Sequence, residues 1–188
     1  MIDAISKGAD VNYINTPDIW GETPLYIATL NNNPDVVEIL LMNGENPNIV
    51  TAMYSDYPLV QAVKIGSVDM TKALLNKGAN PNVNEGKEEL SPIIRAARKQ
   101  SIEIVKLVIE AKANVNIVGH GGTTALADAL TNYEVVKLLL EAGADPTIKD
   151  NYGHSAYYTA KHAYWTNKDL IDLFESYVPE DERINYIP

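Results

Sequence analysis

The sequence predicts an all-α helical solenoid, a stack of similar helical units along the whole chain of 188 residues. Two short markers recur in phase, and an amphipathic run lies between them. Successive copies of a marker are separated by 31 to 36 residues, and a period of about 33 residues is typical of stacked repeats. Each unit of such a stack buries its apolar face against its neighbours and leaves an extended outer surface.

The first marker ends each unit with a turn. Its copies are Gly-Ala-Asp-Val-Asn (8–12), Gly-Glu-Asn-Pro-Asn (44–48), Gly-Ala-Asn-Pro-Asn (78–82), Lys-Ala-Asn-Val-Asn (112–116) and Gly-Ala-Asp-Pro-Thr (143–147). Glycine adopts the left-handed conformation that ends a helix, and Asp or Asn favours a tight turn through side-chain hydrogen bonds. Lys112 replaces glycine in the fourth copy, so we expect a strained or looser turn there.

The second marker starts the first helix of each unit. Its copies are Thr-Pro-Leu-Tyr-Ile-Ala (23–28), Tyr-Pro-Leu-Val-Gln-Ala (57–62), Ser-Pro-Ile-Ile-Arg-Ala (91–96), Thr-Ala-Leu-Ala-Asp-Ala (124–129) and Ser-Ala-Tyr-Tyr-Thr-Ala (155–160). Ser or Thr is a good N-cap, and proline suits the first helical position. Thr23-Pro24 and Ser91-Pro92 fit this pattern fully, whereas Tyr57 cannot cap a helix in this way.

The amphipathic runs predict the second helix of each unit. They cover residues 36–41, 70–75, 104–109 and 135–140, and Asn33, Ser67, Ser101 and Asn132 precede them as N-caps. Together with the two markers, these runs resemble the ankyrin-repeat family up to about Tyr177. The resemblance implies a β-hairpin-like loop, two antiparallel helices and a return turn in each unit. The Trp, Gly and Tyr spacing of tetratricopeptide units is absent.

We expect a single ankyrin-repeat solenoid over residues 1–188. A partial repeat (1–16) precedes repeats at 17–49, 50–83, 84–117 and 118–148, and 149–188 forms a capping repeat with an acidic tail. The chain is either a piece of a longer array, which is the favoured interpretation, or is closed by a half-repeat. The segment between Ala129 and Val135 is two residues shorter than its equivalents, which predicts a clipped helix–helix turn. The matching segment of the last unit is about two residues longer and contains Tyr164 and Trp165.

Composition limits the classes of partner. The net charge of −10 argues against nucleic acid, whose phosphates attract basic surfaces, and it permits a protein partner with a basic patch. No apolar run approaches the roughly 20 residues of a membrane span, and cysteine is absent. We therefore expect a monomer without membrane contact, either cytoplasmic or delivered into a host cell. The acidic C-terminal residues are interpreted as a solubilising cap, with a docking tail as the alternative.

No pattern of catalytic or metal-binding residues stands out. The histidines, His120, His154 and His162, lie in different units or eight residues apart. The Gly119–Gly122 segment superficially resembles a phosphate-binding loop, but it lacks the flanking strand and helix and the lysine that such a loop needs. No carboxylate pair sits in an apolar stretch that would suit it to acid–base work. We expect no active site, no metal and no cofactor.

The family resemblance implies a binding surface made of the loop tips and the exposed flank of each first helix. The residues that we assign to protein binding are Ile19, Trp20, Glu22, Leu30, Met53, Tyr54, Asp56, Lys64, Arg98 and Tyr152. Further candidates are Asn31, Ile65, Lys87, Glu88, Leu90, Lys99, His120, Thr123, Asn151 and His154. Aromatic residues, Met and Arg are enriched at the centres of interfaces, so Trp20, Met53 and Tyr54 form the expected hot spot. The alternative is that these three side chains pack on one another, or that Trp20 covers an exposed end of the stack.

The leading functional interpretation is a non-enzymatic protein–protein interaction module, a scaffold or adaptor that binds a partner on its concave surface. One alternative is a bacterial protein that neutralises a toxin or acts on a target inside a host cell. Another is the targeting domain of a larger enzyme.

The sequence predicts that Trp20 and Tyr54 anchor the partner. Because a desolvated aromatic anchor contributes about 2 kcal/mol or more, Trp20→Ala with Tyr54→Ala should weaken capture of the native partner by about tenfold or more, with the helical circular dichroism signal unchanged. Changes at Glu175 and Glu182 should matter little. If the cap variant loses binding and the tip variant does not, the acidic tail is the docking element.

Overall fold

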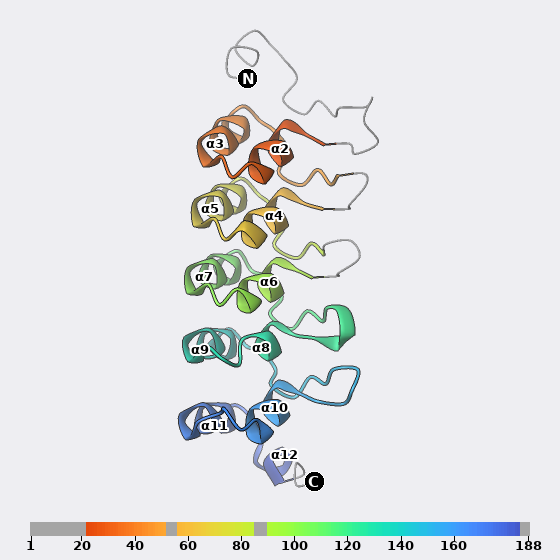
Figure 1. The fold of residues 1–188 in the computed structure, drawn as a ribbon, viewed down its shortest axis with the longest axis vertical. Helices are drawn as coiled ribbons and strands as arrows, with labels where there is room; N and C mark the ends of the chain where they lie inside the picture. The colour runs from red at the N-terminus through yellow and green to blue at the C-terminus, as the bar shows by residue number, and fades with distance from the viewer. Residues whose placement is uncertain (1–21, 52–55, 85–89, 185–188) are drawn as a thin grey trace.

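The computed structural model describes residues 22–51, 56–84 and 90–184, and over these residues the chain is a stack of helix pairs (Figure 1). The pairs are α2 (Pro24–Leu30) with α3 (Pro34–Met42), α4 (Pro58–Ile65) with α5 (Val68–Asn76), α6 (Pro92–Arg98) with α7 (Ile102–Glu110), α8 (Ala125–Asp128) with α9 (Tyr133–Glu141), and α10 (Ala156–His162) with α11 (Lys168–Glu175). A 3-10 turn, η1 (His120–Gly122), precedes α8, and α12 (Glu180–Ile184) follows α11. The predicted helical solenoid is confirmed.

The first helices of the pairs form one column and the second helices form another, with the loops projecting beyond the first column (Figure 1). In the described part of the chain no strand forms, although Lys149 and Ser155 make an isolated antiparallel bridge. None of the helices described is long and apolar enough to cross a membrane.

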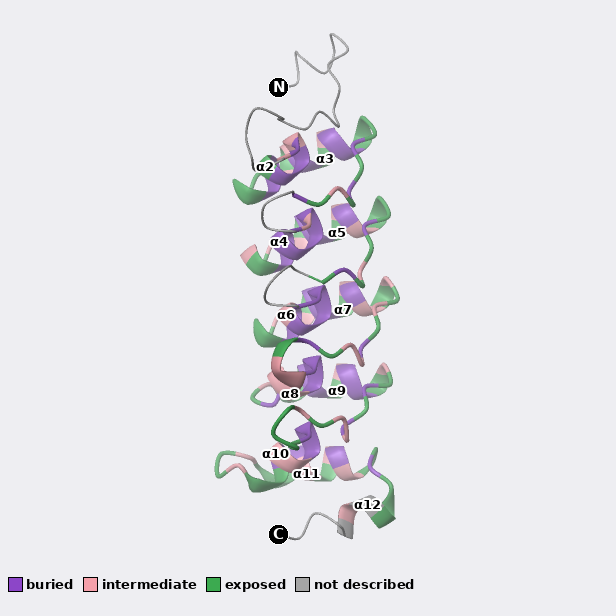
Figure 2. Ribbon diagram, turned by 90° about the vertical axis from the view of Figure 1, so that its right-hand side faces the viewer, coloured by how far each residue is buried: buried purple, intermediate pink, exposed green. Residues whose placement is uncertain are grey.

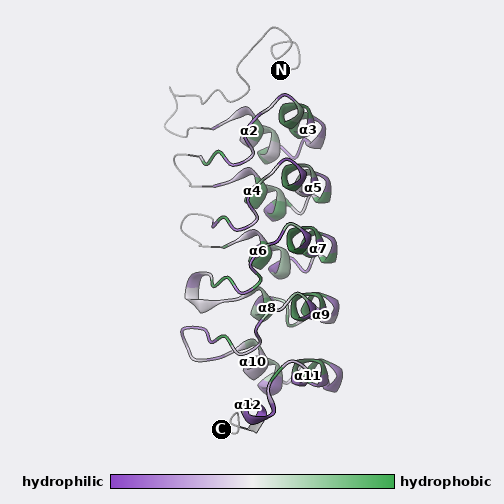
Figure 3. Cartoon of the chain, turned by 180° about the vertical axis from the view of Figure 1, so that it is seen from behind, coloured by the Kyte–Doolittle hydropathy of each residue, from purple (hydrophilic) through white to green (hydrophobic). Residues whose placement is uncertain are grey.

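The core is one continuous apolar column between the two rows of helices. Buried residues line the inner sides of every pair (Figure 2), and hydrophobic residues concentrate in the same helices (Figure 3). The alanine that ends each copy of the second marker is at most 4 % exposed in all five units. The third marker position is also buried in every unit, and it holds Leu25, Leu59, Ile93, Leu126 and Tyr157. Burial of each large side chain contributes about 1.5–3 kcal/mol.

Most of the predicted helix caps form. Hydroxyl or amide oxygens of the N-cap residues accept hydrogen bonds from the first turn at Thr23, Asn33, Ser67, Ser101, Thr124, Asn132 and Ser155. Ser91 was expected to cap α6, and this prediction is wrong. Its side chain makes no capping bond, and its buried Oγ has no hydrogen-bond partner among the described residues. Tyr57 does not cap α4, as expected, and the Asp56 carboxylate accepts a bond from Tyr57 N at 2.8 Å instead.

The turn after each second helix keeps one geometry even where glycine is missing. Lys112 has a left-handed φ of 67°, and Gly78 in the preceding unit has 86°. At Lys112 the two closing bonds of the turn are intact, Lys112 N to Ile109 O at 2.9 Å and Ala113 N to Val108 O at 3.2 Å. The prediction of backbone strain is confirmed, and the prediction of a looser turn is wrong, because both hydrogen bonds hold the lysine in place.

Asparagine side chains connect each turn to the next unit. Within a turn, Asn46, Asn80 and Asn114 accept a bond from the backbone two residues later, which is the tight turn that the sequence predicts. The second asparagine of each marker has a role that the sequence did not indicate. Asn48 Oδ1 accepts from Asn80 N at 2.8 Å, and Asn48 Nδ2 donates to Gly78 O at 2.9 Å. Asn82 and Asn116 accept equivalent bonds from the units that follow them.

The fourth unit absorbs its two-residue deletion within the first helix. Helix α8 has 4 residues, whereas the other first helices have 7 or 8. The shortening therefore removes helix as well as turn, and Asn132 still caps α9 in the ordinary way. In the last unit the longer connection exposes Tyr164 completely and leaves Trp165 43 % exposed.

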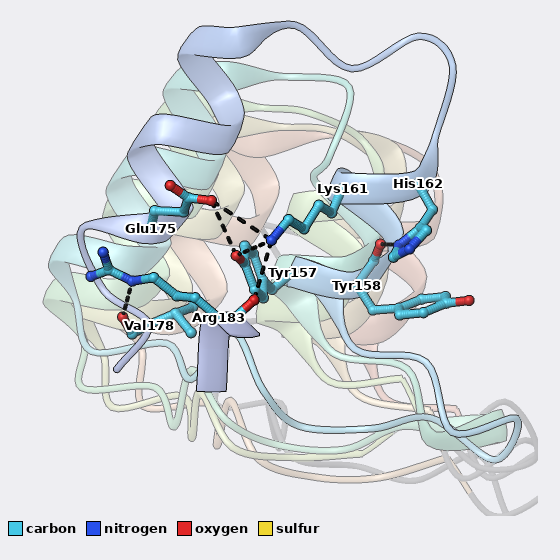
Figure 4. Close-up of polar contacts among 7 residues, drawn as sticks. All are labelled: Tyr157, Tyr158, Lys161, His162, Glu175, Val178 and Arg183. Carbon is cyan, nitrogen blue, oxygen red and sulfur yellow. Dashed lines mark hydrogen bonds and ion pairs between the residues drawn. The ribbon is translucent and has the colours of Figure 1, made fainter. Parts of the chain in front are cut away.

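The C-terminal residues close the stack through α12 (Figure 4). Lys161 Nζ donates to Tyr157 Oη at 3.1 Å and to the backbone oxygen of Arg183 at 3.3 Å. Tyr157 Oη donates to Glu175 at 3.3 Å, and Arg183 Nε donates to Val178 O at 2.8 Å. Helix α12 itself is hydrophilic (Figure 3). One polar network thus joins α10, α11 and α12 at the end of the core.

Replacing the lysine in the left-handed turn should stabilise the protein. Lys112→Gly is expected to raise the free energy of unfolding by about 0.5–1 kcal/mol, because glycine adopts a positive φ without strain. Urea unfolding followed by circular dichroism measures the change. The control is Gly78→Lys, which places the same strain in the preceding turn and should cost about 1 kcal/mol. A loss of stability in Lys112→Gly would show that the lysine side chain stabilises the turn by more than the strain.

Candidate functional site

The loops and the exposed sides of the first helices share one side of the solenoid, which we call the loop face (Figure 1). Of the residues assigned to binding from sequence, Glu22, Leu30, Lys64, Arg98 and Tyr152 lie on this face. The predicted hot-spot residues Trp20, Met53 and Tyr54 lie outside the described residues, as do Ile19, Lys87 and Glu88.

One exposed position near the end of the first helix holds a different type of side chain from unit to unit. Leu30, Lys64 and Arg98 each lie two residues after the buried alanine of their helix, and each is exposed. His162 takes the same position on α10 and is also exposed. Leu30 is 48 % exposed, and Ile27 beside it on the same helix is 36 % exposed. The loop face is therefore apolar at α2, cationic at α4 and α6, and imidazole-bearing at α10.

Asp56 was expected on the binding surface, and the structure corrects this assignment. The residue is 4 % exposed, and its carboxylate accepts hydrogen bonds from Tyr26 Oη at 3.1 Å and Tyr57 N at 2.8 Å. Its backbone also pairs with Thr51 through Thr51 N to Asp56 O at 3.0 Å. Asp56 is buried because these bonds close the base of the loop that begins after Thr51. Its carboxylate is held by these hydrogen bonds and is not available as a contact.

Leu90 was another candidate contact that the structure buries. The side chain is 2 % exposed and belongs to the apolar core, where the chain enters α6. Ile65, expected to be exposed beside Lys64, is half-buried and packs against the same core. Both side chains are apolar, and their packing against the core removes apolar surface from water, which stabilises the fold.

Charged side chains of three neighbouring units interact with one another in the middle of the stack. Arg98 forms an ion pair with Asp128 of α8 at 2.9 Å, and Thr123 Oγ1 donates to the same carboxylate at 3.3 Å. Burial lowers the pKa of Arg95, the attraction of Asp56 opposes this, and the repulsion of Arg98 adds to it. The charges of neighbouring units thus act on one another along the stack.

The loops of the fourth and fifth units pack against each other. Gly119 N donates to Thr123 O at 2.8 Å and closes the fourth loop, and Asp150 N donates to His154 O at 2.8 Å and closes the fifth. Asn151 N of the fifth loop donates to Gly121 O of the fourth at 3.0 Å. Within the Gly119–Gly122 segment, residues 120–122 form the 3-10 turn η1, and this turn is bonded to the fifth loop.

Three rings stack on one another at the start and along α10, the first helix of the last unit. His154 and Tyr158 stack nearly parallel with centroids 4.7 Å apart, and Tyr158 and His162 stack with centroids 4.2 Å apart. His162 Nδ1 lies 2.8 Å from the backbone oxygen of Tyr158 (Figure 4). Tyr152, at the tip of the adjoining loop, is 83 % exposed. This end of the loop face offers flat rings for contact, which interfaces favour.

Sequence reasoning missed several residues of this face. Tyr158 and His162 were not assigned, although their spacing of four residues puts both rings on one side of α10. Arg95 was not assigned because its marker position holds different residue types in the other units. In the part of the chain that the structure describes, no group of His, Asp and Glu side chains gathers as metal ligands would. What the face offers chemically is contact area, charge and ring surfaces.

Comparison with known proteins agrees with this architecture. A family model described as "Ankyrin repeats (3 copies)" matches residues 59–150, and one described as "Ankyrin repeats (many copies)" matches residues 11–59. The crystal structure of the ankyrin repeat protein EF0377 is similar, with 28% sequence identity and a TM-score of 0.78 over 94% of this chain and 89% of that chain. Comparison with curated proteins gives no match.

The packing of the fourth and fifth loops predicts that alanine substitutions at the adjacent residues Gly121 and Gly122 lower stability by different amounts. A Cβ on Gly122 would lie 2.7 Å from backbone atoms of Asp150 and Asn151, whereas one on Gly121 would meet nothing within 4 Å. Both have positive φ. Gly121→Ala should therefore cost about 1 kcal/mol, and Gly122→Ala about 2–4 kcal/mol because overpacking adds to the strain. Urea unfolding compares the two, and equal costs would contradict the tight packing.

Proposed function

The chain belongs to the ankyrin-repeat family, and we propose that it binds a partner protein through the loop face. Ankyrin repeats are generally protein–protein interaction modules and typically non-enzymatic. The observation that carries the proposal is the exposed row at Leu30, Lys64, Arg98 and His162. Side chains of three different chemical types occupy equivalent positions there, so the face offers a distinct contact at each unit.

The rigidity of the scaffold supports the proposal. The second, fourth and fifth loops are closed at their bases by backbone hydrogen bonds, and the fourth loop is bonded to the fifth. A surface whose loops are already ordered loses less conformational entropy when a partner binds. The loop face is therefore pre-organised along the last two units, where Tyr152 and the ring column of α10 lie.

The surface of the second helices, on the opposite side of the stack, is a weaker candidate for partner binding than the loop face. On α11, the second helix of the last unit, Lys168 pairs with Asp172 four residues later. Exposed pairs at a spacing of four residues are typical of a solvated helix surface and contribute little to stability. Met42 is the large apolar residue most exposed on this side in the described second helices, and it stands alone at the end of α3. An isolated apolar residue of this kind is normal on a protein surface.

A photo-crosslinking comparison within one unit tests the proposal. A benzophenone amino acid replaces Leu30 on the loop face or Met42 on the opposite column, and the two proteins are irradiated in lysate of the native organism. The two sites are well matched, because the side chains are 48 % and 64 % exposed and come from adjacent helices. We expect a defined protein adduct from the Leu30 variant only, identified by mass spectrometry.

The converse result is equally informative. An adduct from the Met42 variant without one from the Leu30 variant would place the partner on the second helices and refute the assignment of the loop face.

A further inference from the structure

An open cleft lies between the helix–helix connections of the last two units. It has a volume of about 270 Å³ and is lined by Leu130 and Tyr133 on one side and by Trp165, Thr166 and Leu170 on the other. The two irregularities of length in the sequence meet here, because the shortened connection after α8 faces the longer connection after α10. The longer connection projects beyond the shorter one (Figure 2). The cleft is separate from the loop face, since its walls are these connections and not the loops.

The cleft combines buried aliphatic side chains with exposed aromatic ones. Leu130 and Leu170 are 6 % and 5 % exposed, whereas Tyr133 and Trp165 are 40 % and 43 % exposed. In the described part of the chain neither of these rings stacks on another ring, unlike the rings of α10. Both rings are therefore available to a further aromatic ring, which is attracted at centroid distances of about 4.5–7 Å.

One buried polar atom at the cleft lacks a hydrogen-bond partner. Oγ1 of Thr166 is buried and makes no hydrogen bond within the described residues. The side-chain oxygen of Asn167, the next residue, is already engaged, because it accepts the capping bond from Leu170 N at 3.0 Å. A buried hydroxyl without a partner is unfavourable. The best occupant of the cleft is thus an aromatic ring that carries a hydrogen-bonding group.

The chain displays such a ring directly beside the cleft. The side chain of Tyr164 is 100 % exposed, and the next residue is Trp165, which lines the cleft. A phenol ring fits the available volume, since an apolar cavity of about 150 Å³ already accommodates benzene. The phenol hydroxyl can both donate and accept a hydrogen bond, as the hydroxyl of Thr166 can. Tyr164 does not fill its own cleft, because its side chain is fully exposed.

The closeness of Tyr164 to the cleft suits a contact between two copies of the chain. A two-fold contact uses the same surface patch on both copies, so the patch has to contain both the inserted group and the site that receives it. Tyr164 and the cleft meet this requirement within neighbouring residues. Each copy can insert its own Tyr164 while it receives the other.

The charges beside the cleft also permit two copies to meet there. The net charge of −10 makes copies of the chain repel one another, so a contact is favoured where the local charges balance. Glu134 and Lys137 on α9 and Lys168 and Asp169 on α11 are exposed and sum to zero charge. Within the described residues Glu134, Lys137 and Asp169 form no ion pair. They are available for pairs between copies.

We propose that two copies of the protein form a symmetric dimer in which Tyr164 of each copy occupies the cleft of the other. The ring lies between Tyr133 and Trp165, and its hydroxyl is hydrogen-bonded to Thr166 Oγ1. The inference goes beyond the proposed function and does not depend on it, because the loop face stays free for a partner protein. The dimer also differs from the monomer that the sequence predicts.

The area of the patch makes this dimer weak. Tyr164, Trp165 and Tyr133 together expose on the order of 400 Å² per copy, given about 150–250 Å² for a whole aromatic side chain. A stable interface buries about 600 Å² or more on each partner. We therefore expect a dissociation constant on the order of 0.1 mM.

Sedimentation equilibrium of the full chain tests the dimer over a concentration range of about 10 µM to 1 mM. The average mass should rise from 20.7 kDa toward twice that value. Tyr164→Ser should weaken association by about tenfold or more, because it removes the inserted ring. The matched control is Tyr152→Ser, which changes the 83 % exposed tyrosine on the loop of the same unit and should have no effect. Circular dichroism checks that both variants are folded.

A double-mutant cycle tests the hydrogen bond between copies. Tyr164→Phe and Thr166→Val each remove one hydroxyl, and each should weaken association by about threefold to tenfold. The double variant should lose no more than either single variant, since both remove the same bond. Thr166→Val should not lower the stability of the monomer, because its hydroxyl has no partner there. Independent, additive losses would show that the two hydroxyls do not meet.

Three results would overturn the dimer. The first is a chain that stays monomeric up to about 1 mM, well above the expected dissociation constant. The second is a dimer that Tyr164→Ser leaves intact, and the third is one that Tyr152→Ser weakens equally. In the last two cases the contact lies on another surface.

Photo-crosslinking distinguishes a second copy from another occupant. A benzophenone amino acid replaces Tyr164, and the protein is irradiated both purified and in lysate of the native organism. We expect an adduct of two copies in both samples. An adduct with a different protein, from a chain that is monomeric when purified, would overturn the dimer and assign the cleft to that protein. The outcome is independent of crosslinking at Leu30, which reports on the loop face.

Discussion

Neighbouring repeats are held in register by a side-chain amide that belongs to one unit and bonds to the backbone of the next. Asn48 uses both its oxygen and its nitrogen in this way, toward Asn80 N and Gly78 O. Asn116 repeats the arrangement toward Asp145 N and Gly143 O. These hydrogen bonds hold each turn against the turn of the next unit. The apolar residues of successive helix pairs are thereby aligned and pack into one continuous core. A slip of one position would break both amide bonds and misalign the buried rows, so the register supports the whole stack.

Because the units are in register, equivalent positions of successive repeats lie side by side on one surface. Residues about 34 positions apart become neighbours on the loop face, as Leu30, Lys64 and Arg98 show. The fourth unit keeps this alignment although α8 is short, since Asp128 of α8 still lies 2.9 Å from Arg98. The deletion shortens α8 as well as the turn after it, and it is tolerated because the core residues Leu126 and Ala129 stay buried. The scaffold therefore permits variation at the helix ends and on the loop face while the core is maintained.

The two columns of helices carry different side chains. Acidic residues outnumber basic ones on the described second helices, whereas the first helices carry exposed Leu30 at one end, Lys64 and Arg98 in the middle and stacked rings at the other end. At α10 the stacked rings of His154, Tyr158 and His162 lie beside the network that fastens α12. The terminal unit thus closes the core with one side of its helices and extends the contact surface with the other. A partner that spans the face would meet apolar, cationic and aromatic contacts in succession.

The sequence alone determined the repeat period, the positions of the helices, most of their caps and the left-handed turn at Lys112. These features depend on short-range rules of capping and backbone conformation, which act within a few residues. Tertiary structure decided what each repeat position contributes. Asp56 and Leu90 look like loop residues in sequence, but hydrogen bonds to Tyr26 and contact with the core bury them. The bridging bonds of Asn48 and the ion pair between Arg98 and Asp128 depend on how one unit lies on the next. Only the stacked units define those distances, because no single repeat contains both partners.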